Sequence, residues 1–274
     1  MANSVHPQFL TSAAGQVFML YYAPTNPVRG AVLYLPPLAE EMNRCRALVA
    51  AQARAFANAG YACLLLDYFG TGDSAGELAD AAWQTWQADV LTAADWLEKE
   101  SGMPVTLWGC RLGALLAADV ASQNPSRFRR LIFWQPVVDG KMYLTQFLRL
   151  RVAFLMDRGL PPETTDQMRA QLSNNQSMVI SGYAIPAAIA NAIDPIRITD
   201  RAGLSGCHID WLENVSEPGK PFAIASQKAI ETLQSQGNKV ESFPFTAPPM
   251  WQLHERDEAP DLLEKTTGIF VSKP

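Results

Sequence analysis

Short apolar segments alternate with longer amphipathic segments along most of the chain. The apolar segments predict strands at residues 16–22, 29–35, 61–67, 105–108, 130–134, 207–212 and 239–243. The amphipathic segments predict helices at residues 46–59, 81–100, 114–121, 221–236 and 259–270. Strands that alternate with helices in this way favour an α/β fold, with a mostly parallel sheet of about eight strands and helices on both faces.

This alternation is interrupted between residues 137 and 206. Residues 142–158 form an amphipathic segment rich in Leu, Phe and Met, and residues 165–173 and 185–193 also have helical composition. The pattern predicts an inserted helical cap over the carboxyl ends of the strands. The expected division is a core made of residues 1–136 and 207–274, with residues 137–206 as the cap.

The stretch around residue 111 has the pattern of a nucleophile elbow. A buried strand at 105–108 is followed by Gly109-Cys110-Arg111-Leu112-Gly113 and then by a helical segment. The two glycines allow close approach of strand and helix, and the middle residue is held in a strained turn. That middle residue is Arg111, and Cys110 stands one position too early. The pattern therefore favours a hydrolase fold more than it favours hydrolysis.

Three stretches resemble the exosortase A system-associated hydrolase 2 family, and the order of elements resembles the α/β-hydrolase fold with a cap over nearly the whole chain. The stretches are LPPLAEEMNR at 35–44, LDYFGTGDSAG at 66–76 and WGCRLGA at 108–114. PMWQ at 249–252 and EAP at 258–260 fit the same resemblance. The resemblance implies a hydrolase of the ester, thioester or acyl-carbohydrate class, linked to exopolysaccharide and exosortase systems.

A working acyl hydrolase of this fold needs a nucleophile, a base and an orienting acid. Glu213 matches the acid position best, with Asp210 and Glu217 as alternates. Prolines and a tryptophan occupy the expected histidine position, so His254 is the remaining candidate for the base. A Ser-His-Asp triad is therefore not assembled, and the site is predicted to be degenerate.

Arg111 has two interpretations. A guanidinium stays protonated, so it cannot be a nucleophile, but it can bind an anionic group of the substrate. Alternatively, it forms an ion pair with Glu40 or Glu41 and fills the place of the serine, which we favour because buried arginines are rarely unpaired. Cys110 could act as the nucleophile only if the turn shifted by one residue to bring it into the nucleophile position. The favoured interpretation is therefore a packed thiol.

The remaining site predictions concern the loop expected at residues 36–43, after the third core strand. Since a proline has no N–H, the oxyanion donors are expected to be Leu38 or Ala39, together with Leu112. The predicted substrate-binding residues are Leu38, Glu40, Glu41, Asn43, Leu112 and Trp251.

Composition narrows the range of functions. Apolar residues make up 48% of the 274 residues, which argues against disorder, and the net charge of -5 without a basic stripe excludes a nucleic-acid partner. The four cysteines form no CxxC pair, so we expect no disulfide, metal or cofactor. No signal peptide or membrane-spanning run is apparent, which predicts the cytoplasm.

Two functional hypotheses remain. The first is an enzyme with an unconventional site that acts on a small-molecule or acyl-carbohydrate substrate, and the second is a non-catalytic binding or scaffold protein on the same fold. The sequence leaves both a monomer and a homodimer open.

Overall fold

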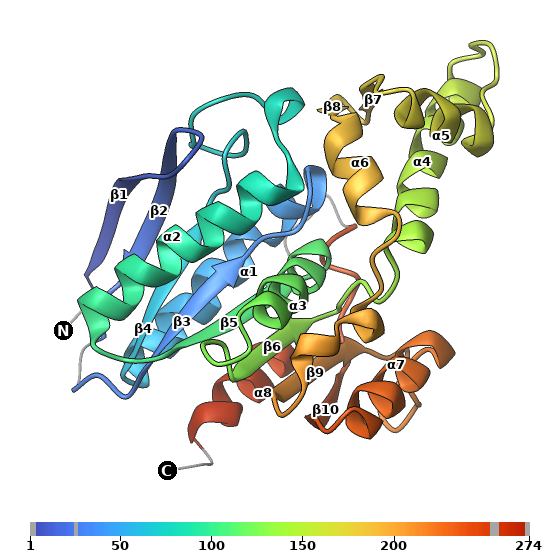
Figure 1. The fold of residues 1–274 in the computed structure, drawn as a ribbon. Coiled ribbons are helices and arrows are strands. Elements are labelled where there is room, and N and C mark those ends of the chain that lie inside the picture. The colour runs from blue at the N-terminus through green and yellow to red at the C-terminus, as the bar shows by residue number, and fades with distance from the viewer. Residues whose placement is uncertain (1–3, 25–26, 253–257, 272–274) are drawn as a thin grey trace.

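The computed structural model describes residues 4–24, 27–252 and 258–271 (Figure 1). Its centre is an eight-stranded sheet with strand order β1-β2-β4-β3-β5-β6-β9-β10. The first two pairings, β1 with β2 and β2 with β4, are antiparallel, and the pairings from β4 to β10 are parallel. This mostly parallel sheet confirms the predicted fold class.

The strands are β1 (Val5–Thr11), β2 (Gln16–Tyr22), β3 (Gly30–Leu35), β4 (Tyr61–Leu66), β5 (Val105–Cys110), β6 (Arg130–Trp134), β7 (Met178–Ile180), β8 (Tyr183–Ile185), β9 (His208–Asn214) and β10 (Lys239–Phe245). The helices are α1 (Glu40–Asn58), α2 (Trp83–Ser101), α3 (Leu112–Gln123), α4 (Gly140–Asp157), α5 (Thr165–Ser173), α6 (Ala187–Ile193), α7 (Ile224–Ser235) and α8 (Pro260–Val271). Short 3-10 turns occupy Leu78–Asp80, Ile198–Asp200 and Ala202–Leu204.

Helices cover both faces of the sheet, as its apolar strands require. Helices α1 and α8 pack on one face, while α2, α3 and α7 pack on the other (Figure 1). Every residue of β5 is buried, because a parallel strand in the middle of such a sheet has no solvent-facing side. Strand β5 therefore presents only its carboxyl end to ligands.

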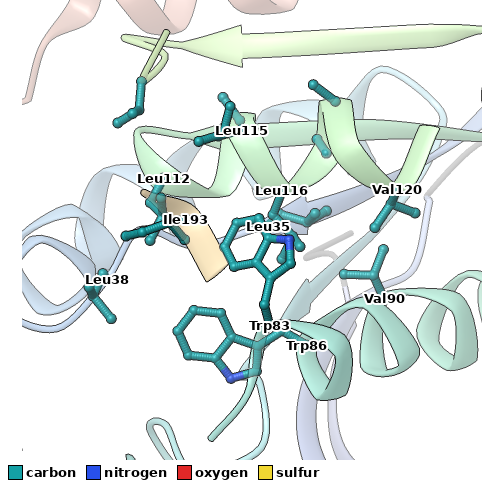
Figure 2. Close-up of a cluster of buried hydrophobic side chains, with 14 of the residues drawn as sticks. Leu35, Leu38, Trp83, Trp86, Val90, Leu112, Leu115, Leu116, Val120 and Ile193 are labelled. Atoms are coloured by element: carbon teal, nitrogen blue, oxygen red, sulfur yellow. The ribbon is translucent and has the colours of Figure 1, made fainter. Parts of the chain in front are cut away.

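A cluster of buried side chains holds α2 and α3 against β3 below this end (Figure 2). Trp83 and Trp86 of α2 lie close to Leu112 and Leu116 of α3, with Leu35 between the helices and the sheet. Close packing of this kind fixes the position of the α3 N-terminus, where the elbow lies.

The segment between β6 and β9 places α4, α5, α6 and the β7–β8 hairpin beyond the carboxyl ends of the parallel strands (Figure 1). The side chain of Asp139 caps α4 by accepting from Met142 N–H, and Thr164 forms a capping box with Gln167 at α5. None of the described helices is both long and apolar enough to cross a membrane.

Helix α1 begins at Glu40, six residues before the predicted start at 46. The loop after β3 therefore ends at Ala39, whose positive φ of 54° turns the chain into the helix. The polar run that predicted a loop is the first turn of a helix, where acidic side chains interact favourably with the helix dipole. The β7–β8 hairpin was also not predicted, and the predicted helix at 185–193 begins after it.

Candidate functional site

The elbow adopts the geometry that its sequence predicts. Arg111 has a φ of 53° and a ψ of -117° between the end of β5 and the start of α3. A Cβ on Gly109 would lie 2.4 Å from Ala114 Cα, and one on Gly113 would lie 2.1 Å from the Leu35 carbonyl oxygen. Both glycines are therefore required for the close approach of strand and helix, which confirms the prediction.

Arg111 forms an ion pair with Glu41, which confirms the predicted pairing. Its Nε and Nη2 atoms donate to the same carboxylate oxygen, Glu41 Oε1, at 3.2 and 3.1 Å. The pair is thus not a two-oxygen fork, and the other oxygen, Glu41 Oε2, accepts from Tyr143 O–H at 3.4 Å. The side chains of Arg111 and Glu41 are 14% and 16% exposed, so the pair lies largely out of solvent.

Aromatic rings enclose the guanidinium. The Cζ atom of Arg111 lies 5.1 Å from the ring centroid of Trp251 and 5.9 Å from that of Tyr143. Burial opposes the charge of Arg111, but Glu41 and Tyr143 outweigh this effect and raise the pKa of the guanidinium. Burial, and then Glu41, hold the pKa of Tyr143 well above its usual range, so its hydroxyl stays protonated as a donor.

A cavity of about 430 Å³ opens beside this pair. Its described lining residues come from α1, the elbow, α4, the β7–β8 hairpin and the loop after β10: Ala39, Glu40, Glu41, Arg44, Arg111, Tyr143, Gln146, Phe147, Leu150, Ser181, Tyr183, Trp251 and Gln252. Glu40 Oε2 accepts from Tyr183 O–H at 2.8 Å, and Glu40 Oε1 accepts from Arg44 Nε at 3.3 Å. Two carboxylates and two guanidinium groups therefore line the cavity in neutralised pairs.

The structure brings five of the predicted site residues to this cavity, namely Ala39, Glu40, Glu41, Arg111 and Trp251. Asn43 does not line the cavity itself, but its side-chain amide donates to the hydroxyl oxygen of the lining residue Tyr183 at 2.8 Å. Leu38 and Leu112 have buried side chains, so only their backbone N–H groups are available to a ligand. Leu112 is the first residue of α3, and the first N–H groups of a helix have no partner within it.

Cys110 is fully buried, does not line the cavity, and packs in the cluster beneath α1 and α8. A hydrogen bond with Cys45, together with burial, raises the pKa of Cys110 well above its usual range. A thiol that cannot ionise is a poor nucleophile. Its surroundings support the interpretation as a packed thiol.

We therefore expect Cys110 to react slowly with iodoacetamide in the folded protein, at a rate that rises at least tenfold in denaturant. Mass spectrometry of the alkylated peptide measures this rate. Cys110→Ala should leave ligand binding and any hydrolase activity intact, and loss of most activity in that variant would instead identify a cysteine hydrolase.

The acid candidates lie away from the cavity lining. Glu213 is buried within β9, where its carboxylate accepts from Trp211 Nε1 at 2.9 Å and from Ala223 N–H at 3.3 Å. Asp210 is near the opposite end of β9 and accepts from Arg130 at 2.9 Å. His254 lies outside the described residues.

Sequence reasoning missed the cavity residues of the cap, above all Tyr143, Phe147 and Tyr183. Tyr143 and Phe147 belong to an amphipathic helix whose apolar face predicted only packing. These two aromatic residues are one helical turn apart, and this spacing was the only signal that both lie on the same face of the helix. Tyr183 lies at the start of β8, in a hairpin that the pattern did not indicate.

Comparison with known proteins fits this geometry. The family described as serine aminopeptidase, S33 (Hydrolase_4) matches residues 26–184, which is more than half of the chain. The chain belongs to this family. In this protein, the matched region begins before β3 and ends in the β7–β8 hairpin, so it contains the elbow, the Arg111–Glu41 pair and α4.

Two curated relatives of this S33 family chain have the names of hydrolases. Monoglyceride lipase of Homo sapiens is 26% identical over 239 residues, which cover 83% of this chain and 74% of the lipase. The mitochondrial palmitoyl-protein thioesterase ABHD10 of Bos taurus is 30% identical over 121 residues, which cover 44% of this chain and 37% of the thioesterase.

Solved structures share the fold. Est1E from Butyrivibrio proteoclasticus, bound to ferulic acid, has a TM-score of 0.68 at 14% identity and covers 97% of this chain and 98% of its own. A thermostable carboxyl esterase from Bacillus coagulans has a TM-score of 0.67 at 15% identity, with 98% of both chains covered. Together with the family match, this shared fold shows that the chain is a member of the α/β-hydrolase superfamily.

Proposed function

We propose that this S33 family chain binds an acylated carbohydrate in the cavity beside Arg111 without forming a covalent acyl intermediate. The observation that carries this proposal is the Arg111–Glu41 ion pair at the nucleophile position of the elbow. An arginine cannot attack a carbonyl carbon, and this one is held by a carboxylate and two aromatic rings. The elbow therefore offers a binding surface in place of a nucleophile.

The charges around the cavity favour a neutral, hydroxylated headgroup. Arg111 is neutralised by Glu41, and Arg44 lies 3.3 Å from Glu40. A strongly anionic ligand would have to displace a carboxylate that already occupies the guanidinium, which argues against the anion-binding interpretation of Arg111. Sugar hydroxyls, in contrast, can donate to Glu40 and accept from Arg44 without breaking either pair.

The walls of the cavity suit both the sugar and the acyl chain of an acylated carbohydrate. The flat ring of Trp251 offers an apolar face to the C–H side of a sugar, beside polar groups that accept or donate hydrogen bonds. Phe147 and Leu150 of α4 extend this lining as an apolar surface, and Leu150 remains 49% exposed. An acyl chain that follows α4 out of the cavity would cover this surface.

We also propose that residues 137–206 act as a cap over a core made of residues 1–136 and 207–274. The cap supplies Tyr143, Phe147 and Tyr183 to the cavity. The resemblance of the three sequence stretches to the exosortase A system-associated hydrolase 2 family supports a place in exopolysaccharide or exosortase systems, where acylated carbohydrate is a natural ligand class.

Hydrolysis of an ester, thioester or acyl-carbohydrate is the second candidate function. It is favoured by membership in the S33 family and by the lipase and thioesterase relatives. A panel of short- and long-chain p-nitrophenyl esters, acyl thioesters and acylated sugars separates the two candidates. Binding without turnover above the uncatalysed rate supports the first, and saturable turnover supports the second.

Trp251→Ala should weaken the binding of a monoacylated disaccharide by about tenfold, since a buried aromatic contact contributes roughly 1–3 kcal/mol to an interface. Fluorescence polarisation of a dye-labelled ligand measures the affinity. Trp96→Ala is the matched control, because Trp96 packs against Tyr21 near the start of the sheet and away from the cavity. Equal losses in the two variants would show that the ligand does not use this cavity.

A further inference from the structure

Four polar side chains meet near the amino-terminal ends of the parallel strands β6, β9 and β10. The elbow lies at the other, carboxyl-terminal end of the parallel strands. His208 and Asp210 alternate along β9 and so point to one face of the sheet. The strand register pairs His208 with Arg130 on β6 and Asp210 with Glu241 on β10. The sheet thus places one imidazole, two carboxylates and one guanidinium side by side on one face.

The potential ligand atoms of this cluster lie close together. His208 Nε2 is 3.4 Å from Asp210 Oδ1 and 3.6 Å from Glu241 Oε1. One ligand atom from each of the three residues falls within 4.8 Å of the others. A metal at the centre of a tetrahedron with bonds of about 2.0–2.1 Å separates neighbouring ligand atoms by about 3.3 Å. The two measured separations are near this value.

A second, independent observation points to a ligand. His208 Nε2 and Asp210 Oδ1 are both enclosed, and neither has a hydrogen-bond partner within the described parts of the chain. A buried polar atom without a partner costs about 1–3 kcal/mol, so such atoms are rare in folded proteins. Here two of them face each other, and a single cation would satisfy both.

We propose that His208, Asp210 and Glu241 form a binding site for Zn²⁺. One imidazole nitrogen and two carboxylate oxygens are ligands that Zn²⁺ accepts, and three protein ligands leave one position for water. His208 and Glu241 keep 22% and 28% of their side-chain surfaces exposed, which gives the ion a route from solvent. The site lies far from the elbow, and an ion there would tie β9 to β10.

The neighbouring cations are compatible with this site. Arg130 Nε donates to Asp210 Oδ2 at 2.9 Å, which orients the carboxylate and leaves Oδ1 directed toward His208. Lys239 Nζ lies 2.5 Å from Glu241 Oε1 and competes with the ion, but its side chain is 63% exposed and can move into solvent. His208 Nε2 has no hydrogen-bond partner within the described residues, so it is available as a ligand atom.

The sequence pattern did not predict this cluster. The histidine and aspartate are two residues apart, but the glutamate follows only in the next core strand. Cys207 precedes the histidine, but its buried thiol donates to the Phe128 carbonyl oxygen at 3.5 Å. The spacing therefore matched no metal motif. Strand pairing alone brings the third ligand into place.

The direct test is titration of the chelator-treated 274-residue chain with ZnCl₂ in a calorimeter. We expect saturable binding of one ion per chain and a rise in the unfolding temperature with added Zn²⁺. His208→Gln and Glu241→Gln should each weaken binding at least tenfold. His6→Gln is the matched control and should bind as the wild type does, because His6 lies on β1 at the far edge of the sheet.

Two further measurements keep the result interpretable if a variant is unstable. Lys239→Ala should bind Zn²⁺ more tightly than the wild type, because it removes the competing cation. Co²⁺ in place of Zn²⁺ should give a visible spectrum without a thiolate charge-transfer band. Absence of saturable binding, equal affinity in His208→Gln and wild type, or a thiolate band would each overturn the proposal.

Discussion

Replacement of Arg111 with serine should lower the free energy of unfolding by about 3 kcal/mol, although it restores the residue type that a serine hydrolase needs. The side chain of Glu41 is only 16% exposed, and the substitution removes the two N–H donors that neutralise it. Loss of one partner of a buried ion pair leaves an uncompensated charge, which typically costs about 3–5 kcal/mol. Denaturant unfolding followed by circular dichroism measures the change.

A double variant provides the control for this interpretation. Arg111→Met with Glu41→Gln removes both charges and keeps similar side-chain volumes, so it should recover most of the stability that Arg111→Ser loses. If the double variant is as unstable as the single one, lost packing rather than the unpaired carboxylate explains the effect.

Arg111→Ser should also fail to hydrolyse esters. Prolines occupy the chain after β10 where a base is expected, and His208 lies at the opposite end of its strand from the elbow side of the sheet. A serine without a base remains protonated and unreactive. Ester hydrolysis in Arg111→Ser that disappears when His254→Ala is added would contradict this expectation and identify His254 as the base.

The second large effect is expected at Gly113. An added Cβ would lie 2.1 Å from the Leu35 carbonyl oxygen and 2.7 Å from the Pro36 carbonyl oxygen, and backbone atoms cannot move aside as a flexible side chain can. Gly113→Ala should therefore destabilise the protein by about 3 kcal/mol, in spite of the better helix propensity of alanine. Thermal and denaturant unfolding measure this loss.

Gly268→Ala is the matched control, since it makes the same substitution within a helix. Apart from its two chain neighbours and the backbone of its own helix, no heavy atom of the described residues lies within 4 Å of an added Cβ there, and α8 gains the propensity of alanine. We expect Gly268→Ala to stabilise the protein by up to about 1 kcal/mol. Similar destabilisation in both variants would show that the clash at the elbow is not the cause.

The sequence predicted the sheet and the elbow because each depends on local patterns, and it predicted that Arg111 pairs with Glu40 or Glu41. Apolar β-branched runs specify strands, two glycines at fixed spacing specify the elbow, and an arginine that points inward requires an acid. Glu41 was one of two candidates, and the helical start of α1 at Glu40 decides between them. Helical geometry directs Glu41 toward Arg111 and Glu40 toward Tyr183.

The rest of the site depends on contacts between distant segments. Tyr143 and Tyr183 reach the cavity only because the segment between β6 and β9 folds back over the strand ends. The hydrogen bond from Tyr143 O–H to Glu41 likewise joins segments about a hundred residues apart, and no local pattern indicates it. Similarly, Glu241 joins His208 and Asp210 through strand register alone.

Calorimetric titration of the wild-type chain with a monoacylated disaccharide tests the central claim, because it records binding and turnover in one experiment. We expect injection heats that saturate at one ligand per chain, with the ester recovered intact by chromatography afterwards. Trp251→Ala should raise the dissociation constant about tenfold. A sustained heat that continues until the ester is consumed, with release of free fatty acid, would contradict the account and establish the chain as a working hydrolase.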